Sequence, residues 1–176
     1  MGSPIAVPGR KVMAKVRLAS VASFGAAIAV LCGSPSLVSP GRAEPVIGPD
    51  AAMCATGKTA LLVRVHGFKG REGLLRVSTF IATESDWMVK GRYIRRIDVA
   101  VPPSGSAHVC IGLPRAGDYG VAVLHDRNGD HKASIWSDGG GFSNNPKLGF
   151  SKPKVDKVAF VAGTGLTTID IQLRYL

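Results

Sequence analysis

Residues 113–126 read LPRAGDYGVAVLHD, and this stretch decides the fold because a turn signal leads directly into an alternating apolar run. Proline and glycine mark the turn, and after it Tyr119, Val121 and Val123 occupy every second position. Successive side chains of a β-strand point to opposite faces, so these three side chains are expected to share one face of a sheet. The stretch therefore predicts a β-strand and not a helix.

The same two-residue period recurs through the chain after residue 44. β-Branched residues are frequent in these runs, and Gly or Pro separates most of them, which is typical of strands joined by turns. The predicted strands are residues 59–67, 73–82, 93–101, 105–113, 118–126, 157–163 and 166–176. Besides the three residues above, the predicted inward side chains are Leu61, Val63, Val65, Leu75, Val77, Thr79, Ile81, Ala107, Val109, Ile111, Leu166, Ile169, Ile171 and Leu173, with Phe80 on the opposite face. About seven strands in roughly 130 residues predict one all-β domain, an antiparallel β-sandwich.

The first 43 residues have the composition of a secretory signal peptide. Lys15 and Arg17 precede an apolar run over residues 18–31, and no Asp or Glu occurs before Glu44. A basic start, a short apolar run and small residues after it are typical of such signals. The apolar run of about fourteen residues is shorter than the roughly twenty that a membrane-spanning helix needs.

We therefore expect translation to start at Met13, with residues 1–12 as an N-terminal extension, and cleavage to follow Ala43. The mature protein would be residues 44–176, a single domain exported to the periplasm with no transmembrane segment after cleavage. A retained membrane anchor is the alternative.

The charge of the predicted mature domain is modest. The chain has 22 Lys and Arg against 12 Asp and Glu, a net charge of +10, but 5 of the bases lie in residues 1–43, so 17 − 12 leaves +5. This value argues against nucleic acid as a partner. The densest basic run is KGRYIRR, residues 90–96, which is interpreted as a solvated face. The alternative is a patch for anionic glycans, lipids or phosphates.

Two cysteines, Cys54 and Cys110, lie in the predicted mature domain. In an oxidising periplasm, an isolated pair in a small domain is most simply a disulfide. It would tie the segment before the first predicted strand to a central strand. Two buried free thiols are the alternative.

Residues 125–156 form the longest stretch without a strand pattern, and it begins HDRNGDHKASIWSDGGGFSNNP. A loop of about thirty residues is unusual in a compact domain, and such loops are usually functional or mobile. The stretch is therefore the predicted binding loop. Its candidate contact residues are His125, Trp136, Phe142, Ser143, Asn144 and Asn145.

A family resemblance also comes from this part of the chain. The pattern Leu113-Pro114-x-x-Gly117-x-Tyr119 resembles the start of a late strand in prealbumin-like sandwiches, where the glycine makes the turn and the tyrosine hydroxyl closes a corner. With HDRNGD at 125–130 and GFSNN at 141–145, the chain resembles the bacterial domain of unknown function 2141 family. The resemblance spans essentially the whole mature domain. It implies a small exported β-sandwich of prealbumin or immunoglobulin-like type and brings no activity with it.

A calcium ion is one candidate ligand of the loop. Asp126, Asn128 and Asp130 match positions 1, 3 and 5 of a calcium-binding loop. His131 stands where such a loop has glycine, and where members of the resembled family have glycine as well, while Ser137 stands where the loop has a bidentate acid. The other interpretation is a tight turn in which these Asp and Asn side chains bind backbone groups.

Other chemistry at the loop has less support. A transition metal would need His125, Asp126 and His131, a spacing that is not diagnostic. His125 and Asp126 are adjacent, so on a strand they point to opposite faces and cannot form a simple relay. No residue is assigned a catalytic role, and a hydrolase using this pair is the least supported function.

The aromatic side chains of the loop allow two interpretations. Trp136, Phe142 and Phe150 would either cap one end of the core or form a platform for a glycan or peptide. The resulting functional hypothesis is a non-catalytic binding or envelope-accessory protein. Its partner, a glycan, a peptide or an envelope protein, would meet residues 125–150. A calcium-stabilised domain is the alternative.

Overall fold

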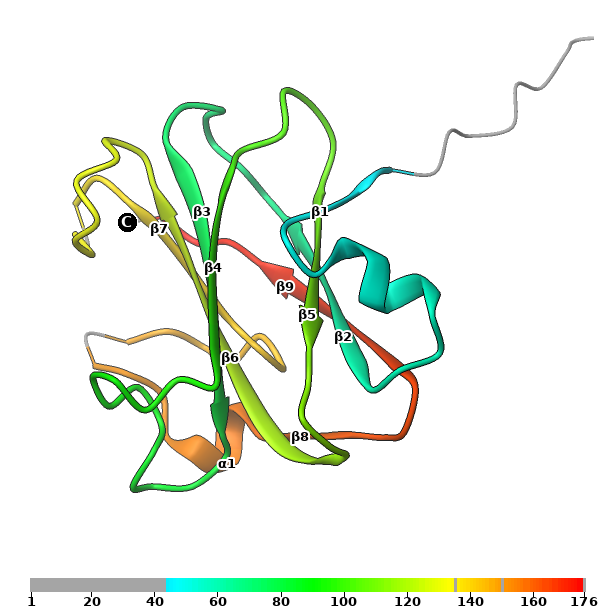
Figure 1. Cartoon of the computed structure of the whole chain (residues 1–176). Coiled ribbons are helices and arrows are strands. Elements are labelled where there is room, and N and C mark those ends of the chain that lie inside the picture. Colours follow the sequence, from blue (N-terminus) through cyan, green and yellow to red (C-terminus); the bar gives the residue numbers. More distant parts are fainter. Residues whose placement is uncertain (1–43, 135, 150, 176) are drawn as a thin grey trace, which may run out of the picture. The chain divides into compact units, whose positions relative to one another are not determined.

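The structure is a computed structural model that describes residues 44–134, 136–149 and 151–175; the predicted signal peptide lies outside the described residues. Within them the protein is all-β, with nine strands in two sheets and two short helical segments (Figure 1). The elements are β1 (Val46–Ile47), the 3-10 helix η1 (Ala51–Ala55), β2 (Ala60–His66), β3 (Leu74–Ile81), β4 (Arg95–Ala100), β5 (Ala107–Gly112), β6 (Gly117–Asp126), β7 (Gly139–Phe142), α1 (Val155–Val158), β8 (Phe160–Ala162) and β9 (Leu166–Gln172). No helix in this part of the chain is long and apolar enough to cross a membrane.

The strands form one mixed and one antiparallel sheet. The antiparallel sheet has the order β4-β3-β6-β7, with β8 paired to β6, and its pairs run antiparallel as predicted. The other has the order β1-β5-β2-β9, and the prediction of antiparallel pairing is wrong for two of its pairs, because β1 runs parallel to β5 and β9 runs parallel to β2. Leu166, the first residue of β9, pairs with Ala60, the first residue of β2. The two strands pair along their whole length from there, so they run in the same direction.

Two strands were not predicted. β1 is only two residues long, and β7 has the sequence GGGF, which offers no apolar alternation. β7 divides the stretch that was predicted to be one loop of about thirty residues, and α1 follows near the end of that stretch. The seven predicted strands correspond to β2, β3, β4, β5, β6, β8 and β9.

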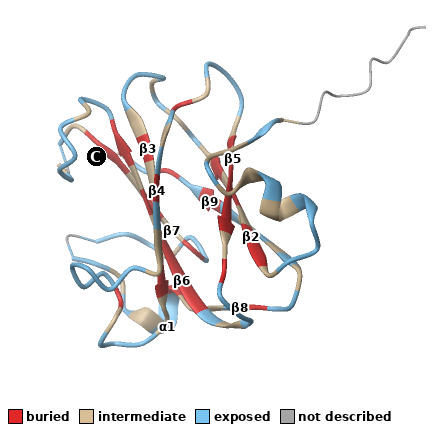
Figure 2. Ribbon diagram, viewed as in Figure 1, coloured by how far each residue is buried: buried red, intermediate tan, exposed pale blue. Residues whose placement is uncertain are grey.

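The core is built from alternate side chains of both sheets (Figure 2). Leu166 is an exception to the predicted inward set, since it is 46% exposed and lies on the opposite parity from Ile169, Ile171 and Leu173. Ile81 and Ile169 are only partly buried and pack against the core. The remaining predicted inward residues are buried: Leu61, Val63, Val65, Leu75, Val77, Thr79, Ala107, Val109, Ile111, Tyr119, Val121, Val123, Ile171 and Leu173.

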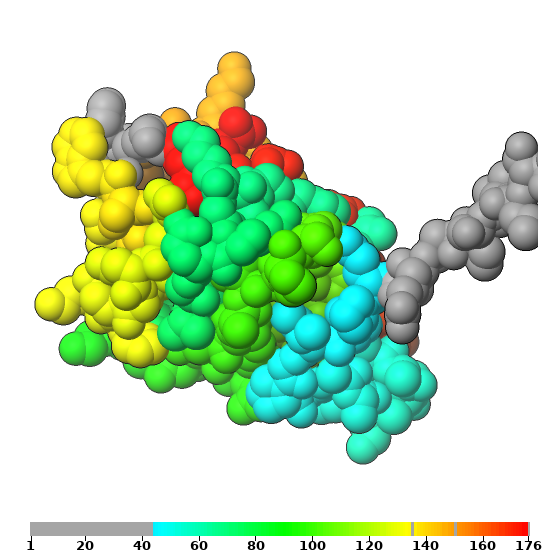
Figure 3. Space-filling view, turned by 90° about the horizontal axis from the view of Figure 1, so that it is seen from above, coloured from blue at the N-terminus to red at the C-terminus, as the bar shows by residue number. Residues whose placement is uncertain are grey.

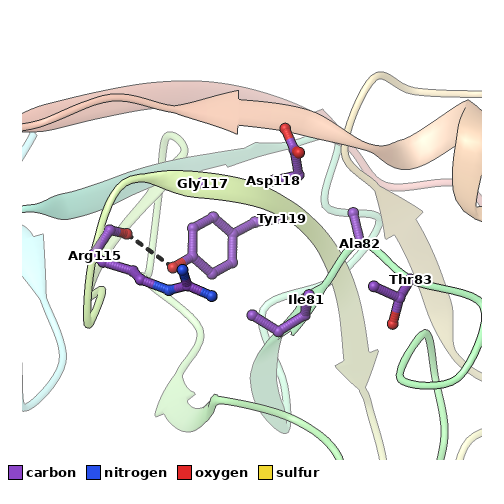
Figure 4. A pocket seen from close by; sticks show the side chains of 7 residues that line it. All are labelled: Ile81, Ala82, Thr83, Arg115, Gly117, Asp118 and Tyr119. Carbon is purple, nitrogen blue, oxygen red and sulfur yellow. Dashed lines mark hydrogen bonds between the residues drawn. The ribbon is translucent and has the colours of Figure 1, made fainter.

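Tyr119 closes the turn before β6, as the family resemblance implied. Its ring is buried, and its hydroxyl donates a hydrogen bond of 2.8 Å to the backbone carbonyl of Arg115 (Figure 4). A small pocket of about 230 Å³ lies beside this corner, lined in part by Ile81 and Thr83. The bond satisfies a buried phenol and fixes the angle at which the chain enters β6.

Gly140 joins one side of the antiparallel sheet to the chain just after β9. It lies in β7 and donates a backbone hydrogen bond of 2.9 Å to the carbonyl of Arg174. The amide of Arg174 returns one of 2.8 Å to the carbonyl of Gly140. The two sheets are therefore connected by backbone pairing along this side.

Two further links lie around η1, on the side of the domain away from β7 and β9. The predicted disulfide is confirmed, and it joins Cys54 in η1 to Cys110 in β5. Asp50, just before η1, accepts hydrogen bonds from the Arg95 guanidinium of β4 at 2.6 and 2.9 Å and from the amide of Gly112 at 3.1 Å. Burial by itself would raise the pKa of Asp50, but these hydrogen bonds and the charge of Arg95 outweigh it and leave the pKa lowered.

The change Asp50→Asn tests this link through its pH dependence. A lowered pKa means that the carboxylate stabilises the fold above its unfolded pKa of about 3.9, and that this contribution is lost as the pH falls through the folded pKa. At pH 7 we expect the variant to lose roughly 1 kcal/mol, a modest value because Arg95 is partly exposed and its charge is screened. In urea unfolding the difference between the two proteins should shrink as the pH is lowered from 7 to 2.5. A difference as large at pH 2.5 as at pH 7 would contradict the ion-pair explanation.

Candidate functional site

The side chains of the predicted calcium loop bind the backbone of their own turn. Asp126 is buried, and its Oδ2 accepts a hydrogen bond of 2.8 Å from the amide of His131. Asn128 Oδ1 accepts from the amide of Asp130 at 3.2 Å, and Asp130 Oδ1 accepts from the amide of Lys132 at 2.8 Å. These contacts are the ones expected of a turn held by Asp and Asn side chains. His131 has a φ of 63°, the conformation for which glycine is preferred.

Two observations bear on whether this turn binds a metal ion. Among the described residues, no three His, Cys, Asp or Glu side chains are grouped closely enough to hold a metal ion. One atom is noteworthy, because Asp126 Oδ1 is buried and has no hydrogen-bond partner among the described residues. Such an atom is costly to bury without a partner, so it is the strongest argument for a bound cation or water at this turn.

His125 is a structural residue between the sheets. Its ring is fully buried, with Nε2 2.8 Å from the carbonyl of Glu72 and Nδ1 2.6 Å from the hydroxyl of Tyr175. Because a carbonyl only accepts, Nε2 carries the proton and Nδ1 accepts from the tyrosine. Burial raises the pKa of Tyr175, so the phenol stays protonated as a donor. Both ring nitrogens are engaged, which gives no support to His125 as a catalytic acid or base.

The GFSNN segment ties three elements together. Ser143 is buried, and its Oγ accepts from the amide of Val121 at 3.0 Å and donates to the carbonyl of Val158 at 2.5 Å. Asn144 Nδ2 donates to the carbonyl of Ala159 at 2.8 Å. Asn145 binds the free edge of β9, where Oδ1 accepts from the amide of Gln172 at 2.7 Å and Nδ2 donates to the carbonyl of Asp170 at 2.9 Å.

Four of the six predicted contact residues, His125, Ser143, Asn144 and Asn145, therefore make contacts that hold the fold. His125 and Ser143 are buried, whereas Asn144 and Asn145 are exposed. Of the predicted aromatic residues, Phe142 is half-buried and packs edge-on against Trp87, with 6.0 Å between ring centroids. Trp136 is 84% exposed, in the segment after β6 that projects at one side of the molecule (yellow in Figure 3). Phe150 lies outside the described residues.

A groove of about 970 Å³ lies over the outer face of the antiparallel sheet. Its floor consists of side chains that alternate away from the core, namely Phe80 from β3, Ala122 and Leu124 from β6, and Phe142 from β7. Apolar side chains from two loops, Met88, Val89 and Leu148, form part of its walls. The size and the largely apolar lining are typical of a ligand site, for which volumes of about 300–1,000 Å³ are usual.

The three glycines of β7 shape this groove. A side chain at Gly139 would collide with the ring of Tyr175, and one at Gly141 with Ile171. Gly140 is different, because a Cβ atom there would have no neighbour within 4 Å. The absence of a side chain at Gly140 therefore leaves open a part of the groove that a larger residue would fill.

The groove was not predicted, although one signal for it is present in the sequence. Phe80 was recognised as lying opposite the core face, and Leu124 and Phe142 share that outward direction. Apolar residues on the outer face of a strand indicate a second covered surface or a binding site. The walls come from loops distant in sequence, whose positions the local pattern does not specify.

The fold and the groove define a small all-β protein with a ligand-sized cavity on one sheet face. The family model described as an uncharacterized protein conserved in bacteria, DUF2141, matches residues 63–170, more than half of the chain, and the protein belongs to this family. This match confirms the resemblance seen in the sequence. No curated protein and no solved structure gives a significant match.

The change Ser143→Ala tests the structural role of the GFSNN segment. It leaves the buried amide of Val121 and the carbonyl of Val158 without their side-chain partner, and an unsatisfied buried group costs about 1–3 kcal/mol. We expect a loss of that size in urea unfolding. The exposed Ser104→Ala variant is the control and should be unchanged within about 0.5 kcal/mol. Equal stability of the two variants would show that the Ser143 hydroxyl does not hold these strands.

Proposed function

We propose that this protein is an exported, non-catalytic binding protein of the bacterial envelope, and that its ligand occupies the groove on the outer face of β4-β3-β6-β7. The observation that carries the proposal is the open cavity of about 970 Å³ with an apolar floor. A concave site of this volume with a largely apolar lining is typical of ligand pockets. The groove is bordered by the predicted binding segment, residues 125–150, through Ser134, Asp138 and Leu148.

The architecture that we propose is a β-sandwich of prealbumin or immunoglobulin-like type. Side chains of β2 and β5 share one hydrophobic core with those of β3 and β6, as in two packed sheets. The tyrosine corner at Tyr119 supports this assignment. The export that we propose is supported by the signal-peptide composition of residues 1–43 and by the disulfide, which is typical of oxidising compartments.

A binding role fits the groove better than catalysis does. An active site needs a nucleophile or acid next to a base, arranged around a reacting atom. No histidine lines the groove, and Asp138 is the only carboxylate among its described lining residues. Both oxygens of Asp138 accept hydrogen bonds from backbone amides, those of Ser134 at 2.9 Å and Arg127 at 3.3 Å.

Filling the groove at Gly140 tests the proposed binding site. N-phenyl-1-naphthylamine, an uncharged apolar dye that fluoresces outside water, should bind the wild-type protein. The Gly140→Phe variant should bind it at least tenfold more weakly, because the new ring occupies the cavity. Gly163→Phe is the matched control, since Gly163 also has open space around it but does not line the groove, and it should bind the dye normally. Equal binding by all three proteins would refute the groove as the site.

A calcium-stabilised turn is the second candidate function, and the unpartnered Asp126 Oδ1 favours it. An ion present at about 100 times its Kd would stabilise the native state by about 2.7 kcal/mol. Under this hypothesis, thermal unfolding with calcium and with a chelator should differ, and Asp126→Ala should abolish the difference. Absence of any calcium effect on the wild-type protein would exclude calcium as a structural ligand and leave residues 126–132 as a turn.

A further inference from the structure

On the basis of the proposed binding role of the groove, we infer that its ligand is a single-chain anionic amphiphile, a fatty acid whose chain covers the apolar floor and whose carboxylate binds the basic rim. This inference depends on two features of the same cavity. One is the continuity of apolar side chains along the floor and walls. The other is the set of basic side chains around it that have no acidic partner.

The apolar part of the groove suits a flexible hydrocarbon chain. Phe80, Ala122, Leu124 and Phe142 form the apolar floor. On the same face of β3, the polar lining side chains are Ser78, which accepts from the Arg96 guanidinium at 3.3 Å, and Arg76, which is paired with Asp98. Met88 and Val89 are each 39% exposed, and Leu148 is 37% exposed. These three residues line the groove and belong to the small set of large apolar side chains that are exposed in the described part of the chain. A chain lying among them would remove their apolar surface from water.

The rim of the groove is positively charged. Five basic residues around it are exposed and form no ion pair with any described residue: Lys90, Arg96, Lys147, Lys152 and Arg174. Arg76 also lines the groove, but its guanidinium is bound to Asp98 at 2.7 Å. The sole lining acid among the described residues, Asp138, is buried and hydrogen-bonded to backbone. The rim therefore has an excess of positive charge, which attracts an anionic head group.

Two of these cations are held in place by contacts that leave donors free. Lys152 Nζ donates one hydrogen bond to the carbonyl of Trp87 at 3.1 Å, and an ammonium group has three donors. The guanidinium of Arg96 lies over the ring of Tyr93, 4.4 Å from its centroid. A carboxylate could thus form charge-assisted hydrogen bonds to groups that are already positioned. The basic run at residues 90–96, first interpreted as a solvated face, supplies part of this rim.

Other ligand classes would contact either the apolar floor or the basic rim, but not both. An uncharged sugar would find few hydrogen-bonding groups on the floor and would leave the cations without counter-charge. A nucleic acid or polyphosphate would use the cations and leave the apolar floor exposed. A molecule with one apolar chain and one anionic group uses both.

The test compares three ligands that have the same ten-carbon chain, each below its micelle concentration, as displacers of bound N-phenyl-1-naphthylamine. Decanoate should displace the dye at a concentration at least tenfold lower than decyl alcohol does, and decyltrimethylammonium should be weakest. In the variant Lys90→Glu/Lys147→Glu, decanoate affinity should fall at least tenfold, and that of decyl alcohol should change less than about twofold. The control Lys58→Glu/Lys154→Glu has the same net charge change away from the groove, and it should behave like the wild type.

The outcomes separate this inference from the proposed function. If decanoate and decyl alcohol compete equally, the preference for an anion is refuted while groove binding stands. If none of the three displaces the dye, although Gly140→Phe still abolishes dye binding, the amphiphile is refuted and a peptide becomes the next ligand to test. If both charge-reversal variants lose decanoate affinity equally, the effect is one of net charge, and the assignment to the rim is refuted. If the wild-type protein and the Gly140→Phe variant bind the dye equally well, the proposed function itself is refuted.

Discussion

Strand β6 is paired on both sides, with β3 along one edge and with β7 and β8 along the other, and this pairing imposes a strict two-residue period on its side chains. Tyr119, Val121, Val123 and His125 are consequently fixed toward the interior. Ala122, Leu124 and Asp126 are fixed toward the opposite face. A one-residue slip would exchange the two sets, placing Asp126 in the core and Val123 in the groove. The core, the groove and the polar turn after β6 therefore all depend on one register.

Polar side chains maintain that register at the places where the backbone pairing ends. His125 closes the end of β6 against Glu72 and Tyr175, and Ser143 binds the amide of Val121 where β7 no longer pairs with β6. Asn145 performs the equivalent role for β9. Each of these groups is hydrogen-bonded to a specific partner, so each opposes displacement of its strand. The predicted binding segment thus also supplies structural contacts, through His125, Ser143 and Asn145.

The sequence predicted the features that depend on the alternation of apolar residues along a strand. It did not predict the features that depend on which strands and loops come together in the folded chain. The buried faces of β2, β3, β5 and β6 follow directly from the apolar positions in their strands. The parallel direction of β9 could not be predicted, because the same alternation is compatible with either direction. β7 was missed because its three glycines give no apolar alternation; Gly139 and Gly141 are required by the close approach of Tyr175 and Ile171, and not by strand propensity. The groove was missed because its walls are loops brought together only in the folded chain.

The backbone bridge between Gly140 and Arg174 also affects which sheet edges are available to other chains. β7 and the segment after β9 satisfy each other there, and Asn145 occupies further donor and acceptor groups of β9. In the described part of the chain, the edges that are left are β1 and β8, which are two and three residues long, and β4, which carries Arg95, Arg96 and Asp98. Short edges and charged edges both resist pairing with a strand of another molecule. The architecture therefore protects a β-rich protein from edge-to-edge aggregation while leaving the groove on the outer sheet face accessible.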